Sequence, residues 1–277
     1  MKSINSRKVA FVTGASRGIG KASAIALAKA GFDVAISART MIDGEGRLDI
    51  NPDLALPGGL NTTLEAIKEQ GVDGHAVYMD VTDRESVKEA VASVLERFEH
   101  VDVLMNNAIC QGHAQHCELV DIDENELRKL FEGNLFSHLA ITKALLPNMI
   151  EKKGGIIINM ISSTAFATPS GRIGKGGWGM GYAMTKAAFA RVAPLLMVEL
   201  AHEGIRTFSI DPGSVITEKW EIANRGKGFD ETNAGTPDMI GAAVAWLASS
   251  DEAHEYDGKV VLAQKETKKR DLILRYL

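Results

Sequence analysis

The sequence TGASRGIG at residues 13–20 decides the fold of this chain. It follows a short β-branched run and opens a stretch of helical composition at about residues 21–30. Gly14 permits a tight turn, while Gly18 and Gly20 let the backbone approach a pyrophosphate and let the helix pack on the strand. The first turn of such a helix offers unpaired N–H groups and a partial positive charge to phosphates. A glycine pattern alone is a weak signal, but its position between the first strand and the first helix predicts a dinucleotide-binding turn.

Short apolar runs alternate with helical stretches along the rest of the chain. The expected strands are residues 9–13, 33–38, 75–79, 101–105, 206–210 and 259–262. A further strand is expected within residues 154–162, without the residues at either end of that run. The expected helices are residues 21–30, 83–99, 124–152, 182–202 and 237–249. Strands that alternate with helices form right-handed βαβ units and a parallel sheet. We therefore predict one α/β domain over residues 1–263, a three-layer Rossmann-type fold with a doubly wound parallel sheet of about seven strands, and a tail at residues 264–277.

Composition excludes several classes of protein. Of the 277 residues, 45% are apolar and 24% charged, as in an ordinary globular protein. Lys and Arg number 31 against 36 Asp and Glu, so no basic excess suggests a nucleic-acid partner. Two cysteines cannot build a disulfide framework, and no apolar run approaches the roughly 20 residues that span a bilayer. The four-residue apolar run near the N-terminus is too short for a secretory signal, so we expect a soluble, cytoplasmic protein.

Two long segments interrupt the alternation of strands and helices. Residues 40–60 carry four glycines and two prolines, and residues 164–181 carry six glycines. Both are expected to leave the carboxyl ends of strands, the edge at which open α/β sheets bind ligands. Long loops in a compact domain are usually functional or mobile, although residues 40–60 could equally be a tolerated surface insertion.

The sequence YAMTK at residues 182–186 places a tyrosine and a lysine four residues apart. On a helix, Tyr182 and Lys186 share one face, one turn apart. The ordinary pKa of tyrosine is about 10, and one ammonium at about 4 Å supplies roughly the 4 kcal/mol that brings such a pKa near 7. The pair can therefore act as an acid/base device, although a lysine lying along an aromatic ring is the commoner reason for this spacing.

Seven short motifs follow one another in order along the chain. They are TGASRGIG at 13–20, DV at 80–81, NNA at 106–108, FEGNLFS at 131–137, INMISST at 158–164, YAMTK at 182–186 and DPGSVIT at 211–217. This set, from about residue 7 to 263, resembles the short-chain dehydrogenase/reductase family. The resemblance implies hydride transfer between a nicotinamide cofactor and the carbonyl or secondary alcohol of a small molecule. The alternative is a catalytically silent cofactor-binding regulator of the same fold, which the presence of Ser163, Tyr182 and Lys186 argues against.

The resemblance assigns catalytic roles to four residues. Tyr182 is the expected general acid that protonates the carbonyl oxygen in reduction, or the base in the reverse direction. Lys186 is expected to lower the pKa of Tyr182 and to hydrogen-bond the nicotinamide ribose, and Ser163 to position and polarise the substrate oxygen. Asn134 is expected to hold a water that links Lys186 to solvent.

The same resemblance assigns the cofactor contacts. The glycine turn is expected to hold the pyrophosphate through Gly14, Ser16, Arg17, Gly18, Ile19 and Gly20. Asp80 and Val81 are expected against the adenine. Asn107 and Ala108 are expected beside the adenosine ribose. The residues expected around the nicotinamide are Pro212, Gly213, Val215, Thr217, Tyr182 and Lys186.

The end of the second expected strand indicates which nicotinamide cofactor is bound. Dinucleotide folds that bind NAD usually carry an acidic residue there, whereas this chain has Ala38 followed by Arg39. A guanidinium can bind a 2′-phosphate through two parallel hydrogen bonds, and Arg17 in the glycine turn could add a second positive charge. We predict NADP(H) over NAD(H), the alternative being that both arginines are simply solvated.

The chain also departs from the pattern of the family that it resembles. Ile109 follows NNA in place of the usual glycine, and Ser163 and Tyr182 are 19 residues apart, a longer spacing than usual. The C-terminal sequence YDGKVVLAQ at 256–264 lacks the frequent Thr-Gly and Asp-Gly-Gly pattern. These differences bear on the substrate and the assembly. The resemblance implies a homodimer or homotetramer, and the tail is expected to pack against a neighbouring subunit.

The sequence CQGHAQHC at 110–117 contains two cysteines and two histidines, the usual ligands of zinc. All four fall in one short loop, whereas tetrahedral zinc sites normally draw ligands from two separated pairs. We expect no metal and place this segment beside the substrate cleft. The residues expected to determine the substrate lie at 109–120, 164–181 and 218–236.

Overall fold

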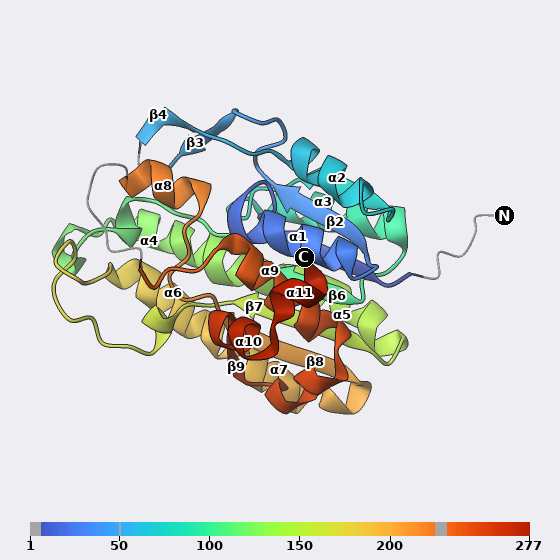
Figure 1. Ribbon diagram of the computed structural model, residues 1–277. Helices are drawn as coiled ribbons and strands as arrows, with labels where there is room; N and C mark the ends of the chain where they lie inside the picture. Colours follow the sequence, from blue (N-terminus) through green and yellow to red (C-terminus); the bar gives the residue numbers. More distant parts are fainter. Residues whose placement is uncertain (1–6, 50, 225–231) are drawn as a thin grey trace.

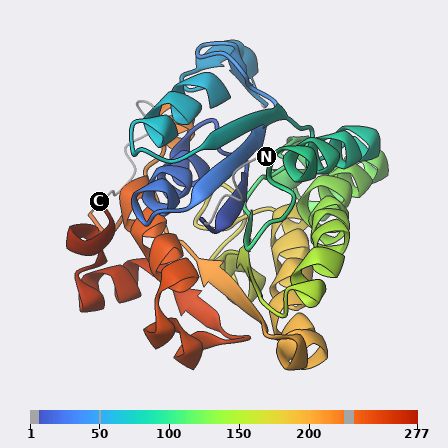
Figure 2. The ribbon, with the colours of Figure 1, turned by 90° about the vertical axis from the view of Figure 1, so that its right-hand side faces the viewer.

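A seven-stranded parallel sheet forms the centre of the molecule, which a computed structural model describes at residues 7–49, 51–224 and 232–277 (Figures 1 and 2). Its strands, in spatial order, are β5 (Gly74–Tyr78), β2 (Asp33–Ala38), β1 (Val9–Thr13), β6 (Val103–Asn106), β7 (Gly155–Met160), β8 (Ile205–Asp211) and β9 (Val260–Leu262). The strand order reverses between β1 and β6, so the carboxyl ends of these two strands border the crevice where a doubly wound fold binds its ligand. The predicted α/β architecture is confirmed.

Helices cover both faces of the sheet and create two hydrophobic cores. One face is covered by α1 (Gly18–Lys29), α2 (Leu60–Lys68), α9 (Pro237–Ser249), α10 (Ala263–Arg270) and α11 (Leu272–Tyr276). The other face is covered mainly by α3 (Arg84–Phe98), α5 (Ser137–Glu151) and α7 (Val192–Leu200). Successive residues of β1 enter opposite cores, Ala10 and Val12 the first, Val9 and Phe11 the second. Burial on both faces explains why these strands are apolar throughout.

Two predicted long helices are interrupted in the structure. The first is split into α4 (Glu124–Phe131) and α5 by one π-helical turn at Glu132–Phe136. The second is split at Arg191 into α6 (Met180–Ala190) and α7. Proline at position 194 has no N–H to donate, which favours a break at that point.

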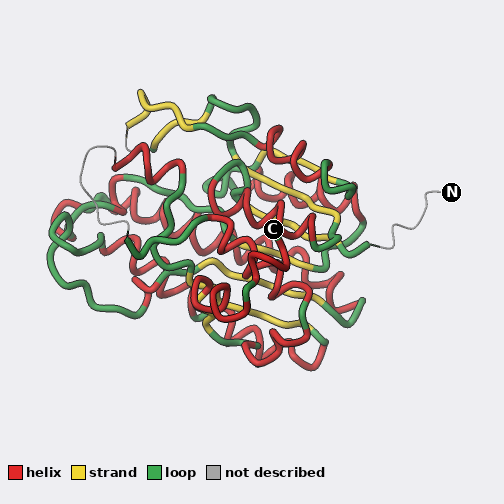
Figure 3. The backbone as a smooth tube through the Cα atoms, in the orientation of Figure 1, coloured by secondary structure: helices red, strands yellow, loops and turns green. Residues whose placement is uncertain are grey.

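The insertion at residues 40–60 is an ordered hairpin, not a simple loop. Strands β3 (Gly46–Leu48) and β4 (Asn51–Leu56) pair antiparallel and lie apart from the main sheet, next to α8 (Glu218–Asn224) (Figure 1). The segment 164–181 begins within a 3-10 turn at Ser163–Ala165, continues as a long loop to residue 179 and ends in the first residues of α6 (Figure 3).

The C-terminal tail packs on its own chain. Helices α10 and α11 contact α9, and Leu272 is fully buried in that contact. One face of the tail is thus buried within the chain, and its contact with a neighbouring subunit stays a prediction. Within the described residues, no helix has the length and apolar character needed to cross a bilayer.

Candidate active site

The glycine turn between β1 and α1 has the geometry predicted for a phosphate cradle. Gly14 and Gly18 adopt left-handed backbone with φ of +71° and +55°, which disfavours residues with a side chain. A Cβ on Gly14 would lie 2.7 Å from the Cα of Ala108, and a Cβ on Gly20 would overlap the carbonyl oxygen of Gly14. The turn is thus compact enough for backbone N–H groups at the start of α1 to face a ligand.

The NNA segment after β6 is anchored directly to β1. The Thr13 hydroxyl accepts hydrogen bonds from the N–H groups of Asn107 (2.9 Å) and Ala108 (3.0 Å). The Asn107 side-chain amide donates to the carbonyl of Thr13 at 2.8 Å. Sequence reasoning did not single out Thr13, which holds the two edges of the crevice together.

A cavity of about 670 Å³ opens over this crevice. The predicted cofactor residues that line it are Gly14, Ser16, Arg17, Gly18, Ile19, Gly20, Arg39, Val81, Asn107, Ala108 and Thr217. Asp80, in contrast to these cavity residues, directs its carboxylate at its own segment. The carboxylate accepts hydrogen bonds from both the N–H and the hydroxyl of Thr82, each at 2.8 Å. The carboxylate of Asp80 thus stabilises its own turn.

The loop after β8, where the nicotinamide contacts were predicted, is braced by the C-terminal helix α10. The Gln264 side-chain amide donates to the carbonyls of Pro212 (2.8 Å) and Ser214 (2.7 Å). Gly213, with φ of +65°, leaves room for that amide. Val215 pairs through an isolated bridge with Gly235. Gln264 therefore sets the path of this loop, a role that no sequence motif indicated.

Lysine 186 lies one helical turn after Tyr182 on α6 and is almost completely buried. Its ammonium donates to the carbonyl of Met160, at the end of β7, at 2.7 Å, and lies 5.9 Å from the centre of the Tyr182 ring. Burial lowers the pKa of Lys186 to about 8, against the opposing effect of Asp211. The pair thus lies together, as predicted.

The serine whose side chain acts on the Tyr182 phenol is Ser162, which lowers the pKa of Tyr182. Ser162 is half-buried at the end of β7, whereas Ser163 is exposed and begins the following 3-10 turn. Burial raises the pKa of Tyr182 above its ordinary value, Ser162 opposes this shift, and Asp211 adds to it. The predicted lowering of the pKa of Tyr182 is not found here, because burial raises that pKa, whereas the role expected of Ser163 towards a substrate oxygen stays a prediction.

Asn134 lies in the π-helical turn between α4 and α5, a rare feature that often marks a functional site. Its side-chain oxygen accepts from the N–H of Cys110 at 2.7 Å, and its amide nitrogen approaches the Thr185 hydroxyl at 3.4 Å. These contacts tie α5 to the loop after β6 and to the helix that carries Tyr182.

Comparison with known proteins decides the family. The family model for short chain dehydrogenases matches residues 8–48 and 56–227. The chain belongs to this family. It is 31% identical over 261 residues to glucose and ribitol dehydrogenase of Daucus carota, covering 92% of this chain and 82% of that one. It is 32% identical over 253 residues to 3-oxoacyl-[acyl-carrier-protein] reductase of Vibrio cholerae, covering 89% and 92%.

The solved structures agree with this assignment. An alcohol dehydrogenase from the archaeon Thermococcus sibiricus, complexed with 5-hydroxy-NADP, superposes with a TM-score of 0.72 at 28% identity, covering 93% of this chain and 96% of that one. As a member of the short-chain dehydrogenase family, the protein is an oxidoreductase that uses a nicotinamide cofactor. The family match is interrupted at residues 49–55, within the β3–β4 hairpin.

Two loops of this dehydrogenase, the one that follows β6 and the one that precedes α6, lie against one another. The Arg172 guanidinium pairs with the Glu118 carboxylate, and Gly179 lies so close to the Gln115 carbonyl that a Cβ there would overlap it. Cys110 and Cys117 are both buried free thiols, and burial raises the pKa of Cys110 to about 11. Across the described residues, no three His, Cys, Asp or Glu side chains are grouped to hold a metal. Of the third expected substrate segment, residues 225–231 lie outside the described residues.

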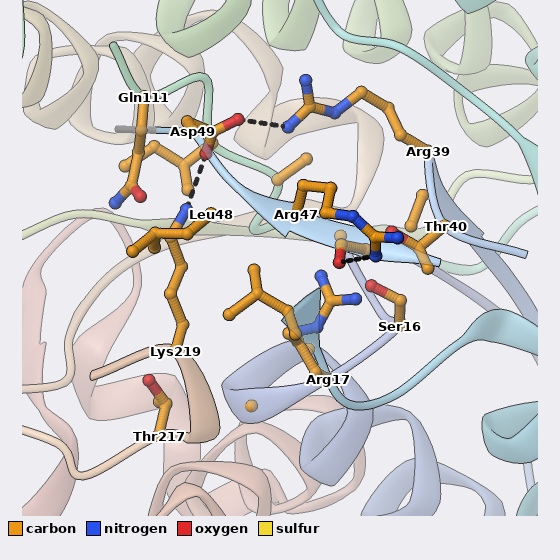
Figure 4. A pocket seen from close by; sticks show the side chains of 18 of the residues that line it. Ser16, Arg17, Arg39, Thr40, Arg47, Leu48, Asp49, Gln111, Thr217 and Lys219 are labelled. Atoms are coloured by element: carbon orange, nitrogen blue, oxygen red, sulfur yellow. Dashed lines mark hydrogen bonds and ion pairs between the residues drawn. The ribbon is translucent and has the colours of Figure 1, made fainter. Parts of the chain in front are cut away.

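The adenosine end of the cavity holds more charged groups than the sequence motifs indicated (Figure 4). Arg17 donates to the carbonyls of Pro57 (2.7 Å) and Gly58 (2.9 Å), so the insertion packs on the glycine turn. Arg39 pairs at 2.9 Å with Asp49, which also pairs with Lys219 of α8 at 2.7 Å. The carboxylate of Glu218 accepts from the N–H of Gly18 at 3.0 Å, at the start of α1.

Proposed function

We propose that this protein is an NADP(H)-dependent carbonyl reductase, or alcohol dehydrogenase in the reverse direction, with Tyr182 as the general acid/base. The observation that carries the proposal is the pairing of Tyr182 with Lys186 on α6, where the buried Lys186 ammonium lies 5.9 Å from the centre of the Tyr182 ring and donates to the carbonyl of Met160. A phenol, a hydroxyl and a cation converge there at the carboxyl end of β7. A group of this composition can donate a proton to a substrate oxygen and stabilise the charge that develops on it.

The proton chemistry follows from the burial of each group. Burial keeps the Tyr182 hydroxyl protonated at neutral pH, as a proton donor to a carbonyl oxygen requires. Ser163 is the proposed residue that orients and polarises that oxygen, while Ser162 lowers the pKa of Tyr182. The Lys186 ammonium stabilises the phenolate that remains after the proton has left. Asn134, in the π-helical turn, is the proposed holder of a water that returns a proton to this site.

The glycine turn fits the pyrophosphate of a nicotinamide dinucleotide, because no side chain could occupy Gly14 or Gly20 without overlap. When bound, the cofactor supplies or accepts the hydride. The proposed contacts are the turn residues of the cavity together with Val81, Asn107, Ala108 and Thr217. Pro212, Gly213 and Val215 are proposed to border the nicotinamide on the loop that Gln264 braces. For Asp80 we propose only that it lies beside the adenine.

The preference for NADP(H) rests on charge. Arg17 and Arg39 both line the cavity, and the strand end between them carries Ala38 in place of an acidic residue. The hydrogen bond to Asp49 outweighs the effect of burial and raises the pKa of Arg39, so its charge is permanent. The 5-hydroxy-NADP in the archaeal alcohol dehydrogenase supports the same choice.

The test is Tyr182→Phe, assayed as NADPH oxidation against a panel of ketones, aldehydes and quinones. We expect a loss of about 10³-fold or more in kcat, with NADPH binding changed less than twofold, because only the proton donor is removed. Retention of substantial activity would falsify the role of Tyr182. Binding of NADPH by the wild-type protein without turnover of any substrate would instead indicate a regulator.

The assembly and the compartment are also proposed. Val198 and Leu195 on α7 are 83% and 52% exposed, an apolar face that a homodimer or homotetramer would cover. Both cysteines are free thiols, as expected in a reducing compartment such as the cytoplasm. Multi-angle light scattering of the purified protein tests the assembly, and a monomeric mass at micromolar concentration would contradict it.

A further inference from the structure

The β3–β4 hairpin contributes a third arginine to the adenosine end of the cavity. Arg47 of β3 lines the cavity together with Arg17, Arg39 and Lys219. The acidic side chains that line it are Glu45 and Asp49, so the lining has an excess of two positive charges. Figure 4 shows the Arg47 and Arg17 guanidiniums near Ser16 and Thr40.

Arg47 and Arg17 are both hydrogen-bonded to carbonyl oxygens, although the carboxylates of Glu218, Asp43 and Asp49 act on the charge of Arg17 from nearby. Arg47 donates to the carbonyls of Gly44 (2.7 Å) and Gly46 (2.8 Å), both within the insertion. Arg17 donates to two carbonyls at the other end of the same insertion. Glycine at position 46 leaves room for the Arg17 guanidinium, because a Cβ there would overlap it. Neutral acceptors fix the direction of a guanidinium and leave its remaining N–H donors and its charge for a ligand.

Asp49 spans two cations and so removes only part of the positive charge. One carboxylate oxygen pairs with Arg39 and the other with Lys219. Burial alone would raise the pKa of Asp49, but the hydrogen bonds from Lys219 and Arg39 outweigh it and hold that pKa below its ordinary value. Asp49 therefore stays ionised and keeps the hairpin against α8, with Arg47 over the crevice.

We infer that Arg47, supplied by the hairpin, is a specificity residue that binds the 2′-phosphate of NADP(H) together with Arg17 and Arg39. This inference rests on the proposed cofactor preference. A phosphate monoester carries a charge of about −2 at neutral pH and has three strong acceptor oxygens, which match the charge excess and the three guanidiniums of this site. The hairpin thus has a ligand-binding role, in place of the tolerated surface insertion that residues 40–60 could have been.

The experiment measures binding of adenosine 2′,5′-bisphosphate and of 5′-AMP to the full-length protein by calorimetry. Arg47→Met removes the guanidinium and keeps a long apolar side chain. We expect the affinity for the bisphosphate to fall about tenfold, as for loss of one charge-assisted hydrogen bond, and the affinity for 5′-AMP to change less than twofold. The matched control is Arg275→Met, which removes an exposed arginine on α11.

The possible outcomes separate this inference from the proposed function. If wild-type protein binds the bisphosphate no better than 5′-AMP, the NADP(H) preference itself is wrong. If wild-type protein discriminates and Arg47→Met discriminates equally well, Arg47 is not a phosphate ligand and the inference is overturned. If Arg47→Met weakens the binding of both nucleotides equally, the substitution has displaced the hairpin, and this result would also overturn the inference. Arg39→Gln serves as the positive control, because it should weaken the binding of the bisphosphate and not the binding of 5′-AMP.

Discussion

The two halves of the cofactor crevice depend on different physical effects. At the catalytic half, Lys186 is 5% exposed and donates to the carbonyl of Met160 at the end of β7. At the adenosine half, the Arg39 side chain is 50% exposed and is held by a carboxylate from a hairpin. Burial shifts the pKa values of the first group, whereas an excess of solvated charge characterises the second. Mutation, pH and salt should therefore affect the two halves unequally.

The largest effect is expected from Lys186→Met. This change removes the cation beside Tyr182 and leaves a side chain of similar length in the buried position. We expect kcat/KM for carbonyl reduction to fall about 10³-fold, within the range for acid–base groups. Lys143→Met on α5, an exposed lysine, is the matched control and should retain wild-type activity. A fall of less than tenfold at Lys186 would show that the catalytic half does not depend on the buried charge.

The second effect is expected at the adenosine half. The double variant Ala38→Asp with Arg39→Gln introduces a carboxylate that repels a 2′-phosphate and can hydrogen-bond a 2′-hydroxyl. We expect the ratio of kcat/KM for NADPH to that for NADH to fall about 100-fold, which reverses the preference. The kcat with the better cofactor should stay within about threefold of wild type. A wild-type preference for NADH would instead contradict the cofactor assignment.

How much the sequence predicts depends on how local each feature is. The glycine turn and the Tyr182–Lys186 pair were predicted because their members lie within eight and five residues of one another. The direction of the pKa shift at Tyr182 could not be predicted in this way, because it depends on burial by segments far away in the sequence.

The hairpin and its charges could not be predicted from local patterns. Strand β4 is exposed along most of its length and shows no alternation of apolar and polar residues. The contact of Asp49 with Lys219 joins residues 170 positions apart, across an insertion that the family match omits. Arg47 was missed for the same reason, because an arginine in a polar, glycine-rich segment is ordinarily solvated.

A third test uses pH to probe the catalytic half alone. Burial lowers the pKa of Lys186 to about 8, so the ammonium is present below that pH and is lost as the pH rises through it. The raised pKa of Tyr182 keeps its hydroxyl protonated over the same range. We expect kcat/KM for reduction to fall about fivefold between about pH 8 and pH 9. A profile that is flat to pH 10 would contradict the buried cation, and NADPH binding should follow a separate curve.

A fourth test uses salt to probe the adenosine half. Raising the ionic strength from about 0.05 M to about 0.5 M shortens the screening length several-fold and weakens solvated charge pairs more than buried ones. We expect the KM for NADPH to rise about threefold to fivefold and kcat to change by less than about 1.5-fold. The KM for NADH measured in parallel should move less, because it lacks the 2′-phosphate. Equal changes in the KM values for the two cofactors would mean that the arginines do not distinguish NADPH from NADH.

The smallest effect is expected at Gln264, on the C-terminal helix α10, which braces the loop between the two halves of the crevice. Gln264→Ala removes two hydrogen bonds, at 2.8 and 2.7 Å, that brace the loop at Pro212 and Ser214. Each such bond contributes about 1 kcal/mol, but the loop keeps its bridge to Gly235, so we expect only a twofold to fivefold rise in the KM for NADPH. Binding of adenosine 2′,5′-bisphosphate should be unchanged, since that ligand lacks the nicotinamide. Gln70→Ala, after α2, is the matched control, and weaker binding of the bisphosphate by Gln264→Ala would show that the loop supports both halves.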